Sequence, residues 1–246
     1  MTLASERAID DDPVLGRYVI HFTSHRLRLL LQAGAVYALS ALIINVVTWN
    51  MEGTLVNIVV PLLYALIAIS LVWAVAHLWN REVIVFEHGF TYRQGSVVAA
   101  FPFLMIARVD VQIETLRLFG LLPYERVLGQ LQSEQGDLIR IDWVFKDSRR
   151  LLDLLERGIL RDRLPVLQAR LASGQEVDFG ALTAAPQSLR DQDGRTLPWE
   201  ELSGVRAEKD SVVILSGGEV WGRYADRDLH SEALLVRLLK ERCRSS

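Results

Sequence analysis

The sequence predicts a helical hairpin that spans a membrane, followed by a larger α+β part on the cytoplasmic side. Residues 29–49 and 53–80 contain no Asp, Glu, Lys or Arg, and each run exceeds the length of about 18 residues at which a membrane span is expected. After residue 81 the pattern changes to short apolar runs separated by Gly-containing turns, which is typical of strands. The predicted hairpin covers residues 29–80.

Residues 1–28 are expected to form a polar tail and a basic interfacial segment. The tail ends in three consecutive aspartates, residues 10–12. The segment from Arg17 to Arg28 mixes aromatic and aliphatic side chains with arginines and histidines, a composition suited to the surface of an anionic leaflet. His21 and His25 are four residues apart, but no further ligand accompanies them, so we expect no metal site.

The distribution of arginines predicts the orientation of the hairpin. Arg17, Arg26 and Arg28 precede the first apolar run and Arg81 follows the second, whereas the connection at residues 50–54 has no Lys or Arg. Because positive residues concentrate on the cytoplasmic side, both termini are expected in the cytoplasm. The prediction is an integral protein of the inner (cytoplasmic) membrane with two spans.

Four residues of the first run, Gly34, Ala38, Ala41 and Asn45, share one helical face. Small side chains at this spacing let a second helix approach closely, and Asn45 can hydrogen-bond across such a contact. The partner helix is either the second run of this chain or another subunit. The sequence leaves both open, and with them a homo-oligomer.

His77 is an ionisable residue inside the second run. A histidine in a span can ligate the metal of a haem or chlorophyll, which makes His77 a candidate cofactor ligand. It also lies about one turn from Arg81, where it reaches headgroups and water. The latter interpretation is preferred, and no cofactor is expected.

Residues 81–160 are predicted to form one unit of strands followed by a helix. Strands are expected at 82–86, 90–93 and 96–101, with turns between them. The alternation of apolar and polar residues over 139–145 predicts another strand with one buried face. A leucine-rich helix then begins at Asp147 or Ser148.

Residues 161–175 are predicted to form a separate connecting helix, with Pro165 in its first turn and Gly174 at its end. Residues 176–246 are predicted as a second unit. Its strands are expected at 177–182, 203–208, 211–216 and 219–224, and its helix begins near Asp228.

The two units share a short pattern: an apolar residue, a proline and an aromatic residue, then an aliphatic residue three positions later. Each copy follows a Gly-containing hairpin and precedes strands and a leucine-rich helix, so we interpret the units as two copies of one fold with these residues in the core. The residues are Pro102, Phe103 and Ile106 in the first copy, and Pro198, Trp199 and Leu202 in the second.

This pattern resembles bacterial pleckstrin-homology-like (PH-like) proteins, many of which place a two-span hairpin directly before the domain. The chain is also similar to an uncharacterised bacterial family in which Phe179-Gly180 and Leu197-Pro198-Trp199 belong to the second copy. The resemblance implies a membrane α-helical hairpin plus tandem PH-like antiparallel β-rolls, each capped by a helix. Members that bind phosphoinositides carry a basic cluster in the first hairpin, where this chain has only Arg93.

The sequence carries no pattern typical of an enzyme: no phosphate-binding Gly-rich loop with Lys, no H-E-x-x-H and no G-x-S-x-G. Asp191-x-Asp193-Gly194 begins like a calcium loop but continues with Arg195 and Thr196, so a hairpin turn is expected. The formal net charge of −3 with intermixed signs offers no basic stripe for nucleic acid. The single cysteine, Cys243, excludes an internal disulfide and fits a reducing compartment.

The function expected from these observations is that of a non-enzymatic, membrane-tethered PH-like adaptor or scaffold. It would bind a protein partner, or a lipid, at the cytoplasmic face of the bilayer. One alternative is an accessory subunit of a larger membrane complex that is contacted through the hairpin, and another is a lipid-sensing module. The cytoplasmic part is expected to be soluble and folded when it starts at Arg81.

Overall fold

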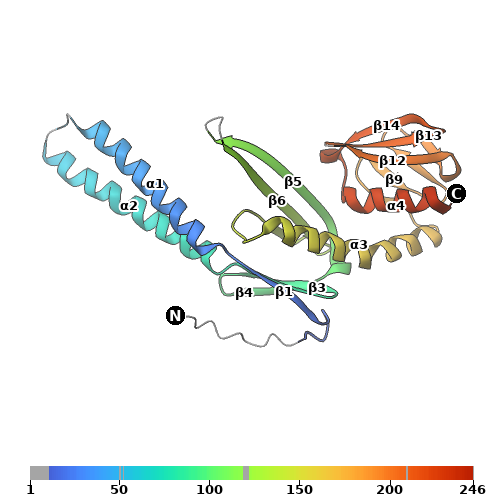
Figure 1. Cartoon of the computed structure of the whole chain (residues 1–246), viewed down its shortest axis with the longest axis horizontal. Coiled ribbons are helices and arrows are strands. Elements are labelled where there is room, and N and C mark those ends of the chain that lie inside the picture. Colours follow the sequence, from blue (N-terminus) through green and yellow to red (C-terminus); the bar gives the residue numbers. More distant parts are fainter. Residues whose placement is uncertain (1–10, 50, 52, 119–121, 209, 246) are drawn as a thin grey trace.

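The computed structural model describes residues 11–49, 51, 53–118, 122–208 and 210–245. Residues 1–10 of the expected tail, and Asn50 and Glu52 of the expected connection, lie outside these ranges. Within the described residues the chain forms four α-helices and four antiparallel sheets, which is an α+β fold. Two apolar helices extend away from two β-rich bodies (Figure 1).

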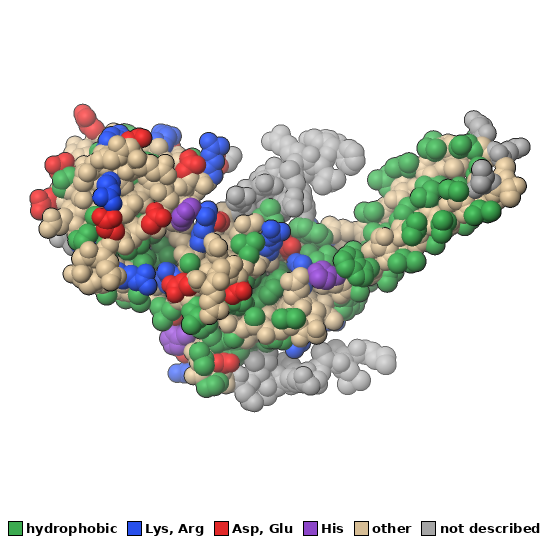
Figure 2. Space-filling view, turned by 180° about the vertical axis from the view of Figure 1, so that it is seen from behind, with side chains coloured by type: hydrophobic (Ala, Val, Ile, Leu, Met, Phe, Trp, Pro, Cys, Tyr) green, Lys and Arg blue, Asp and Glu red, His purple; other side chains and the backbone are tan. Residues whose placement is uncertain are grey.

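The two N-terminal helices, α1 (Arg26–Thr48) and α2 (Thr54–Trp79), form an antiparallel hairpin. Both are long and apolar enough to cross a membrane, by length and composition. Along α2 the partly buried residues recur every three or four positions and face α1; they include Val60, Tyr64, Ile67, Leu71 and Val75. The remaining surface of the hairpin is almost wholly apolar and exposed, whereas charged side chains gather on the β-rich bodies (Figure 2).

A strand precedes the hairpin. Residues Tyr18–Thr23 form β1, which pairs antiparallel with β2 (Glu82–Phe86) on the far side of the hairpin. The expected interfacial segment is therefore, over these residues, part of a sheet. Its side chains alternate between solvent and core, and Phe22 lies buried opposite Val83. The hairpin is inserted between two neighbouring strands instead of preceding the sheet.

The first β-rich body, which we call the first body, contains two small sheets formed by residues 18–141 outside the hairpin. One has the order β1-β2-β3-β4, with β3 (Gly89–Gln94) and β4 (Val97–Pro102). A 3-10 turn, η1 (Phe103–Met105), leads to the other, in which β5 (Ile106–Leu118), β6 (Leu122–Ser133) and β7 pair in this order. The last strand, β7, covers Leu138–Ile141. The predicted strand over 139–145 is therefore shorter, because the Asp142 carboxylate accepts a hydrogen bond from the Val144 amide and turns the chain.

Two long strands, β5 (Ile106–Leu118) and β6 (Leu122–Ser133), form an arm that projects from the first body. Strand β6 pairs with β7 only over residues 129–132. Among the described residues no strand pairs with the outer edge of β6 over 122–128. Figure 1 shows this arm projecting away from α3, beside the hairpin helices in that view.

Helix α3 (Ser148–Ala172) is continuous, so the separate connecting helix predicted at 161–175 is wrong. The apolar stripe continues through the predicted break, from Leu155 and Ile159 to Leu167 and Leu171, and all four side chains are buried. Pro165 lies on the exposed face, where the helix accommodates its missing N–H. Helix α3 contacts both bodies and connects them (Figure 1).

The second body repeats the element order of the first. A four-stranded sheet contains β8 (Val177–Asp178), β9 (Leu182–Ala184), β10 (Ser188–Asp191) and β11 (Thr196–Pro198). The predicted strand at 177–182 is interrupted, because Gly180 adopts a φ of 83°.

A second 3-10 turn, η2 (Trp199–Glu201), leads to a three-stranded sheet, and the body ends in a helix. The sheet contains β12 (Leu202–Glu208), β13 (Ser211–Ser216) and β14 (Glu219–Ala225). A short turn, η3 (Asp226–Asp228), precedes α4 (Glu232–Ser245), which packs on β12 and α3.

Candidate functional site

The base of the hairpin is joined to the first body by a dense set of hydrogen bonds around Ser24. The Ser24 amide donates to the Arg81 carbonyl at 3.1 Å, and its Oγ donates to the Trp79 carbonyl at 2.6 Å. The loop after β7 belongs to the same junction, because the His25 amide donates to the Val144 carbonyl in that loop at 2.7 Å. The start of α1 and the end of α2 are thus held against each other and against the sheet.

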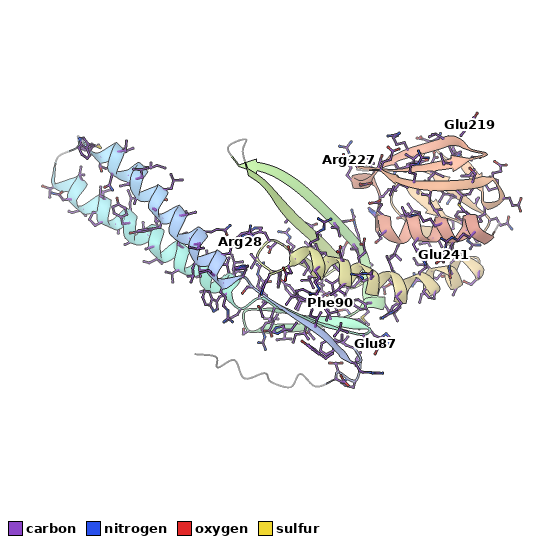
Figure 3. All side chains as sticks on the ribbon, viewed as in Figure 1. Arg28, Glu87, Phe90, Glu219, Arg227 and Glu241 are labelled. Carbon is purple, nitrogen blue, oxygen red and sulfur yellow. The ribbon has the colours of Figure 1, made fainter. Side chains whose placement is uncertain are left out.

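Cationic side chains at this base pack on aromatic rings. The Arg26 guanidinium lies 5.3 Å from the centre of the Trp79 ring, and that of Arg28 lies 5.6 Å from the centre of the Trp143 ring. Figure 3 labels Arg28 where the hairpin meets the first body. Arg81 pairs with Asp142 at 3.3 Å. The junction therefore carries positive charge and aromatic rings together, as the interface region of a bilayer favours.

An open apolar groove of about 700 Å³ lies between α1 and α2 in the half of the hairpin next to this base. We call it the hairpin groove. Its lining residues are Leu30, Ala33, Gly34, Tyr37, Ala68, Leu71, Val72, Val75, Ala76, Trp79 and Asn80. Near its far end the helices touch, with the Tyr37 and Tyr64 ring centres 6.3 Å apart and the Tyr64 hydroxyl donating to the Ala41 carbonyl at 3.3 Å.

The predicted helix-packing residues are only partly brought to α2. Ala41 is half-buried at the contact, whereas Gly34, Ala38 and Asn45 are exposed. Gly34 borders the hairpin groove, and a Cβ built on it would meet no atom within 4 Å. Most of the small-residue face is therefore left open beside the contact between the two helices.

His77 is exposed near the end of α2, as its position in the sequence indicates. Its ring stacks on Trp73 with centres 5.7 Å apart, and its Nε2 lies 3.0 Å from the Gln94 side-chain nitrogen in β3. Because an amide nitrogen can only donate, Nε2 acts as the acceptor in this arrangement. That nitrogen would have to leave Gln94 before it could ligate a metal. The cofactor assignment of His77 remains a candidate from the sequence.

The repeat-motif residues occupy matching places in the two bodies. Pro102 and Pro198 each end a strand, and each precedes a 3-10 turn that begins at the aromatic residue. Phe103 and Trp199 are buried, as are the aliphatic residues that follow the turns, Ile106 and Leu202. Phe103 packs on Phe90, which Figure 3 labels inside the first body.

Asp191 organises a turn instead of a calcium loop. Its buried carboxylate accepts hydrogen bonds from the Arg195 amide at 2.8 Å, from the Arg195 guanidinium at 2.6 Å and from the Tyr224 hydroxyl at 3.2 Å. Burial on its own would raise the pKa of Asp191, but these bonds and the charge of Arg195 outweigh it and lower that pKa below its ordinary value. Burial, followed by the charge of Asp191, raises the pKa of Tyr224.

A small polar pocket of about 170 Å³ lies where α3 meets the second body. Arg163 lines it, is only 8% exposed, and donates to the Ile106 carbonyl. Burial lowers the pKa of Arg163, and the nearby Glu134 opposes this shift. His230 and Ser231 also line it, and the Ser231 hydroxyl accepts a hydrogen bond from the Val109 amide at 3.1 Å. This last hydrogen bond links the second body to the first.

Two carboxyl groups, one on α3 and one on α4, have raised pKa values. Burial, followed by the charge of Asp153, raises the pKa of Glu156. Burial, followed by the charges of Asp226 and Glu156, raises the pKa of Glu232. In the part of the chain that the structure describes, no group of three or more His, Cys, Asp or Glu side chains is arranged to hold a metal ion.

The junction residues around Ser24 were missed by the sequence analysis, although two signals pointed to them. Ser24 lies five residues before Leu29, where the first apolar run begins, and serine is one of the residue types that commonly precede a helix. Residues 18–23 do not alternate strictly between polar and apolar side chains, but they contain the β-branched and aromatic residues typical of a strand. The polar pocket at Arg163 had no local signal, because its residues come from distant parts of the chain.

Comparison with known proteins places the chain in a family without assigning it an activity. A search of the curated proteins found no match. A family model described as "Family of unknown function (DUF6585)" matches residues 1–225. Since that match covers nearly the whole chain, the protein belongs to the DUF6585 family.

Proposed function

We propose that this protein is a non-enzymatic, membrane-tethered adaptor whose hairpin spans the bilayer and whose two β-rich bodies are PH-like units at the cytoplasmic face. The observation that carries the proposal is the pairing of β1 with β2 across the hairpin. Both ends of the apolar hairpin continue into neighbouring strands of one sheet, so a body attached in this way is held at a fixed position against the membrane. A flexible tether would not need this arrangement.

The exposure of the hairpin supports its insertion into lipid. None of the side chains in the most apolar window of either helix is buried. Exposed residues include Leu42, Val46, Leu62, Ile69 and Val72, each with more than half of its surface accessible. A soluble core helix would bury such a surface, and an exposed apolar patch of this extent is typical of a membrane or protein interface. Helices also satisfy their own backbone hydrogen bonds, as lipid requires.

The architecture of the bodies supports the PH-like assignment. Each body has a four-stranded and a three-stranded antiparallel sheet, connected by a 3-10 turn and followed by a helix. Rolled antiparallel sheets closed by one C-terminal helix are what the resemblance to PH-like proteins implies. Such units bind proteins, peptides or lipids and are rarely enzymes, which is why an adaptor is favoured.

The β5–β6 arm is the element we propose for holding a protein partner. The outer edge of β6 over residues 122–128 has no paired strand among the described residues. An unpaired edge presents backbone donors and acceptors that an extended segment of a partner can complete as an added strand. The arm belongs to the same body as the hairpin base, so a partner bound there would be held close to the bilayer.

Shortening the arm tests the adaptor proposal. Residues 113–117 pair with 123–127, so removing both segments keeps the pairing of the remaining residues in the β5–β6 arm. The full-length and shortened proteins should be purified from their native membrane in mild detergent, and the proteins that accompany each should be identified. We expect stoichiometric partners with the full-length chain that are lost with the shortened one. A full-length chain that purifies alone, or partners that are kept by both, would contradict this binding mode.

Thiol labelling tests the orientation. In a Cys243→Ser background, Met51→Cys places a thiol in the connection between the helices and Ser173→Cys places one after α3. A membrane-impermeant maleimide should label the first variant in intact cells and the second only after lysis. Labelling of both in intact cells, or of Ser173→Cys alone, would overturn the proposed topology.

An accessory subunit held through its hairpin is the second candidate function. It is favoured by the exposure of Ala38 and Asn45, which α2 leaves uncovered. In this case the co-purifying partners would remain with the arm-shortened protein and would be lost when Ala38 is replaced by Leu. The two candidates are therefore separated by which of the two variants loses its partners.

A further inference from the structure

We propose that the hairpin groove binds one acyl chain of a phospholipid from the leaflet next to the β-rich bodies, with the lipid phosphate at the start of α1 beside Arg26. The inference rests on the membrane insertion proposed above and names a specific ligand for the hairpin. It concerns a built groove with one charged end, which is different from the general contact that any membrane helix makes with lipid.

The composition of the groove fits an acyl chain. Its volume of about 700 Å³ lies within the range of about 300–1000 Å³ that is typical of small-ligand sites. Its walls are mainly aliphatic, with Leu30 and Ala33 on α1 and Leu71 and Val75 on α2, while aromatic and polar side chains lie only at its ends. A chain without hydrogen-bonding groups can occupy such walls without leaving buried polar groups unpaired.

The length of the groove fits one leaflet. From Trp79 to Ala68, helix α2 rises about 17 Å at about 1.5 Å per residue. Half of the hydrocarbon core of a bilayer is about 15 Å thick. Tyr37 packs on Tyr64 near the far end of the groove, away from the β-rich bodies, so the groove ends close to the middle of the membrane. A third helix that crossed the whole bilayer would need a groove about twice as long.

The positive charge at the end of the groove next to the β-rich bodies fits a phosphate. The Arg26 guanidinium lies over the ring of Trp79, which lines the groove. Arg26 makes no ion pair with any residue that the structure describes. The first turn of α1 has no acidic residue, so its N-terminal dipole adds to the positive charge. A zwitterionic or anionic phospholipid supplies the complementary group at this depth.

Gly34 keeps the groove open. A Cβ at this position would meet no atom within 4 Å, so a larger side chain can extend into the groove without displacing the protein. Gly34→Leu is therefore expected to fill the groove while improving helix propensity, which avoids the ambiguity of a variant that fails to fold. Ala38, one turn further along the same face, does not line the groove and provides a matched control as Ala38→Leu.

Native mass spectrometry of the full-length protein tests the inference. The protein is first shown to remain in alkali-washed membranes, then delipidated in mild detergent and titrated with palmitoyl-oleoyl phosphatidylglycerol. We expect one tightly retained lipid per chain in the wild type and in Ala38→Leu, and loss of this lipid in Gly34→Leu. Arg26→Gln is expected to weaken retention, because it removes the charge at the phosphate end.

Three results would overturn the groove as a lipid site while leaving membrane insertion intact. They are equal retention by the wild type and Gly34→Leu, no lipid retained by the wild type, and disulfide-linked dimers of Gly34→Cys in a Cys243→Ser background. The last result would mean that a second copy of the chain occupies the groove. Release of the wild type by alkali would instead overturn the proposed insertion on which the inference rests.

Discussion

At the scale of single residues, Ser24 connects the sheet with both helices of the hairpin. It is only 5% exposed, its amide donates to Arg81, and its hydroxyl donates to the last residue of α2, Trp79. A helix leaves its final carbonyl groups without partners, and here a side chain at the start of the neighbouring helix supplies one. A buried hydroxyl group therefore helps to hold the hairpin against the sheet.

Ser24→Ala is expected to lower the free energy of unfolding by about 1 kcal/mol, because the partly buried hydrogen bond to the Trp79 carbonyl loses its donor. Thermal unfolding in mild detergent, followed by circular dichroism, measures the effect. Ser96→Ala in the exposed turn before β4 serves as the control and should leave the unfolding temperature unchanged. Equal unfolding temperatures for the two variants would show that the hydroxyl does not stabilise the junction.

Asp191 is expected to make stability depend on pH in the acid range. Its pKa is lowered in the folded protein, so the carboxylate stabilises the fold above its unfolded pKa of about 3.9, and this stabilisation is lost as the pH falls through the lower folded value. Asp191→Asn should lower stability at neutral pH and flatten the acid limb of the stability curve. Denaturant midpoints measured at several pH values below about 5 test this.

Asp193→Asn, in the exposed part of the same turn, is the control for Asp191. It should keep the acid limb of the wild type. If Asp191→Asn also keeps that limb, the hydrogen bonds to Arg195 and Tyr224 do not lower the pKa as the geometry indicates.

At the scale of elements, α3 determines how the bodies are connected. It packs on η1 in the first body, reaches β8 in the second, and contacts α4. It approaches the first body closely at Gly158, where a Cβ would lie 2.4 Å from the Phe103 ring. A glycine inside a helix usually costs about 1 kcal/mol relative to alanine, so its presence here has a packing reason.

Gly158→Ala should therefore destabilise the protein by about 1–3 kcal/mol through overpacking, although alanine favours the helix. The double variant with Phe103→Leu should recover part of this loss, because the smaller side chain makes room for the new methyl group. Denaturant titration of the single and double variants measures the coupling. A stabilising effect of Gly158→Ala alone would mean that the contact with Phe103 is looser than the structure has it.

The elements also show what could be predicted from the sequence. The limits of the two apolar helices follow from uncharged runs, which are local signals. Strand β1 was missed because its partner residues, such as Val83, follow the whole hairpin in the sequence. The predicted break before Pro165 was wrong because the stripe from Ile159 to Leu167 packs on both bodies, and this packing outweighs the preference of proline. The arm strand β5 had a usable signal, since Val109, Val111 and Ile113 alternate with polar residues.

The predicted site residues likewise divide into those that local spacing reveals and those whose surroundings depend on how the helices pack. The motif residues Phe103 and Trp199 are buried as expected of a repeated core pattern, which local spacing reveals. The small-residue face at Gly34 was recognised, but its relation to α2 depends on how the helices rotate against each other. The charged end of the groove joins Arg26 with Trp79 from the opposite end of the hairpin, a proximity that no local pattern contains.

At the scale of the whole molecule, the insertion of the hairpin between paired strands predicts that the remainder folds without it. Thr23 and Glu82 are directly opposite each other in the β1–β2 ladder. Replacing residues 24–81 by Asn-Gly should therefore join the strands through a two-residue turn. The resulting protein should be soluble and monomeric and should unfold cooperatively, as judged by size-exclusion chromatography and circular dichroism.

A chain that starts at Arg81, in contrast, lacks β1 and leaves the edge of β2 open. It should be less stable than the protein with the Asn-Gly turn and more prone to aggregate, because an exposed strand edge pairs with other chains. This revises the expectation from the sequence that Arg81 is a sufficient starting point. If the two proteins are equally stable, β1 is not an essential strand of the first body.

Alkaline extraction of membranes tests the central claim, that lipid surrounds α1 and α2, most directly. Broken cells that contain either the full-length chain or the protein with the Asn-Gly turn are treated with sodium carbonate at high pH and centrifuged. The full-length chain should stay in the pellet until detergent is added, and the shortened protein should be in the supernatant. A full-length chain released by carbonate alone would contradict the account.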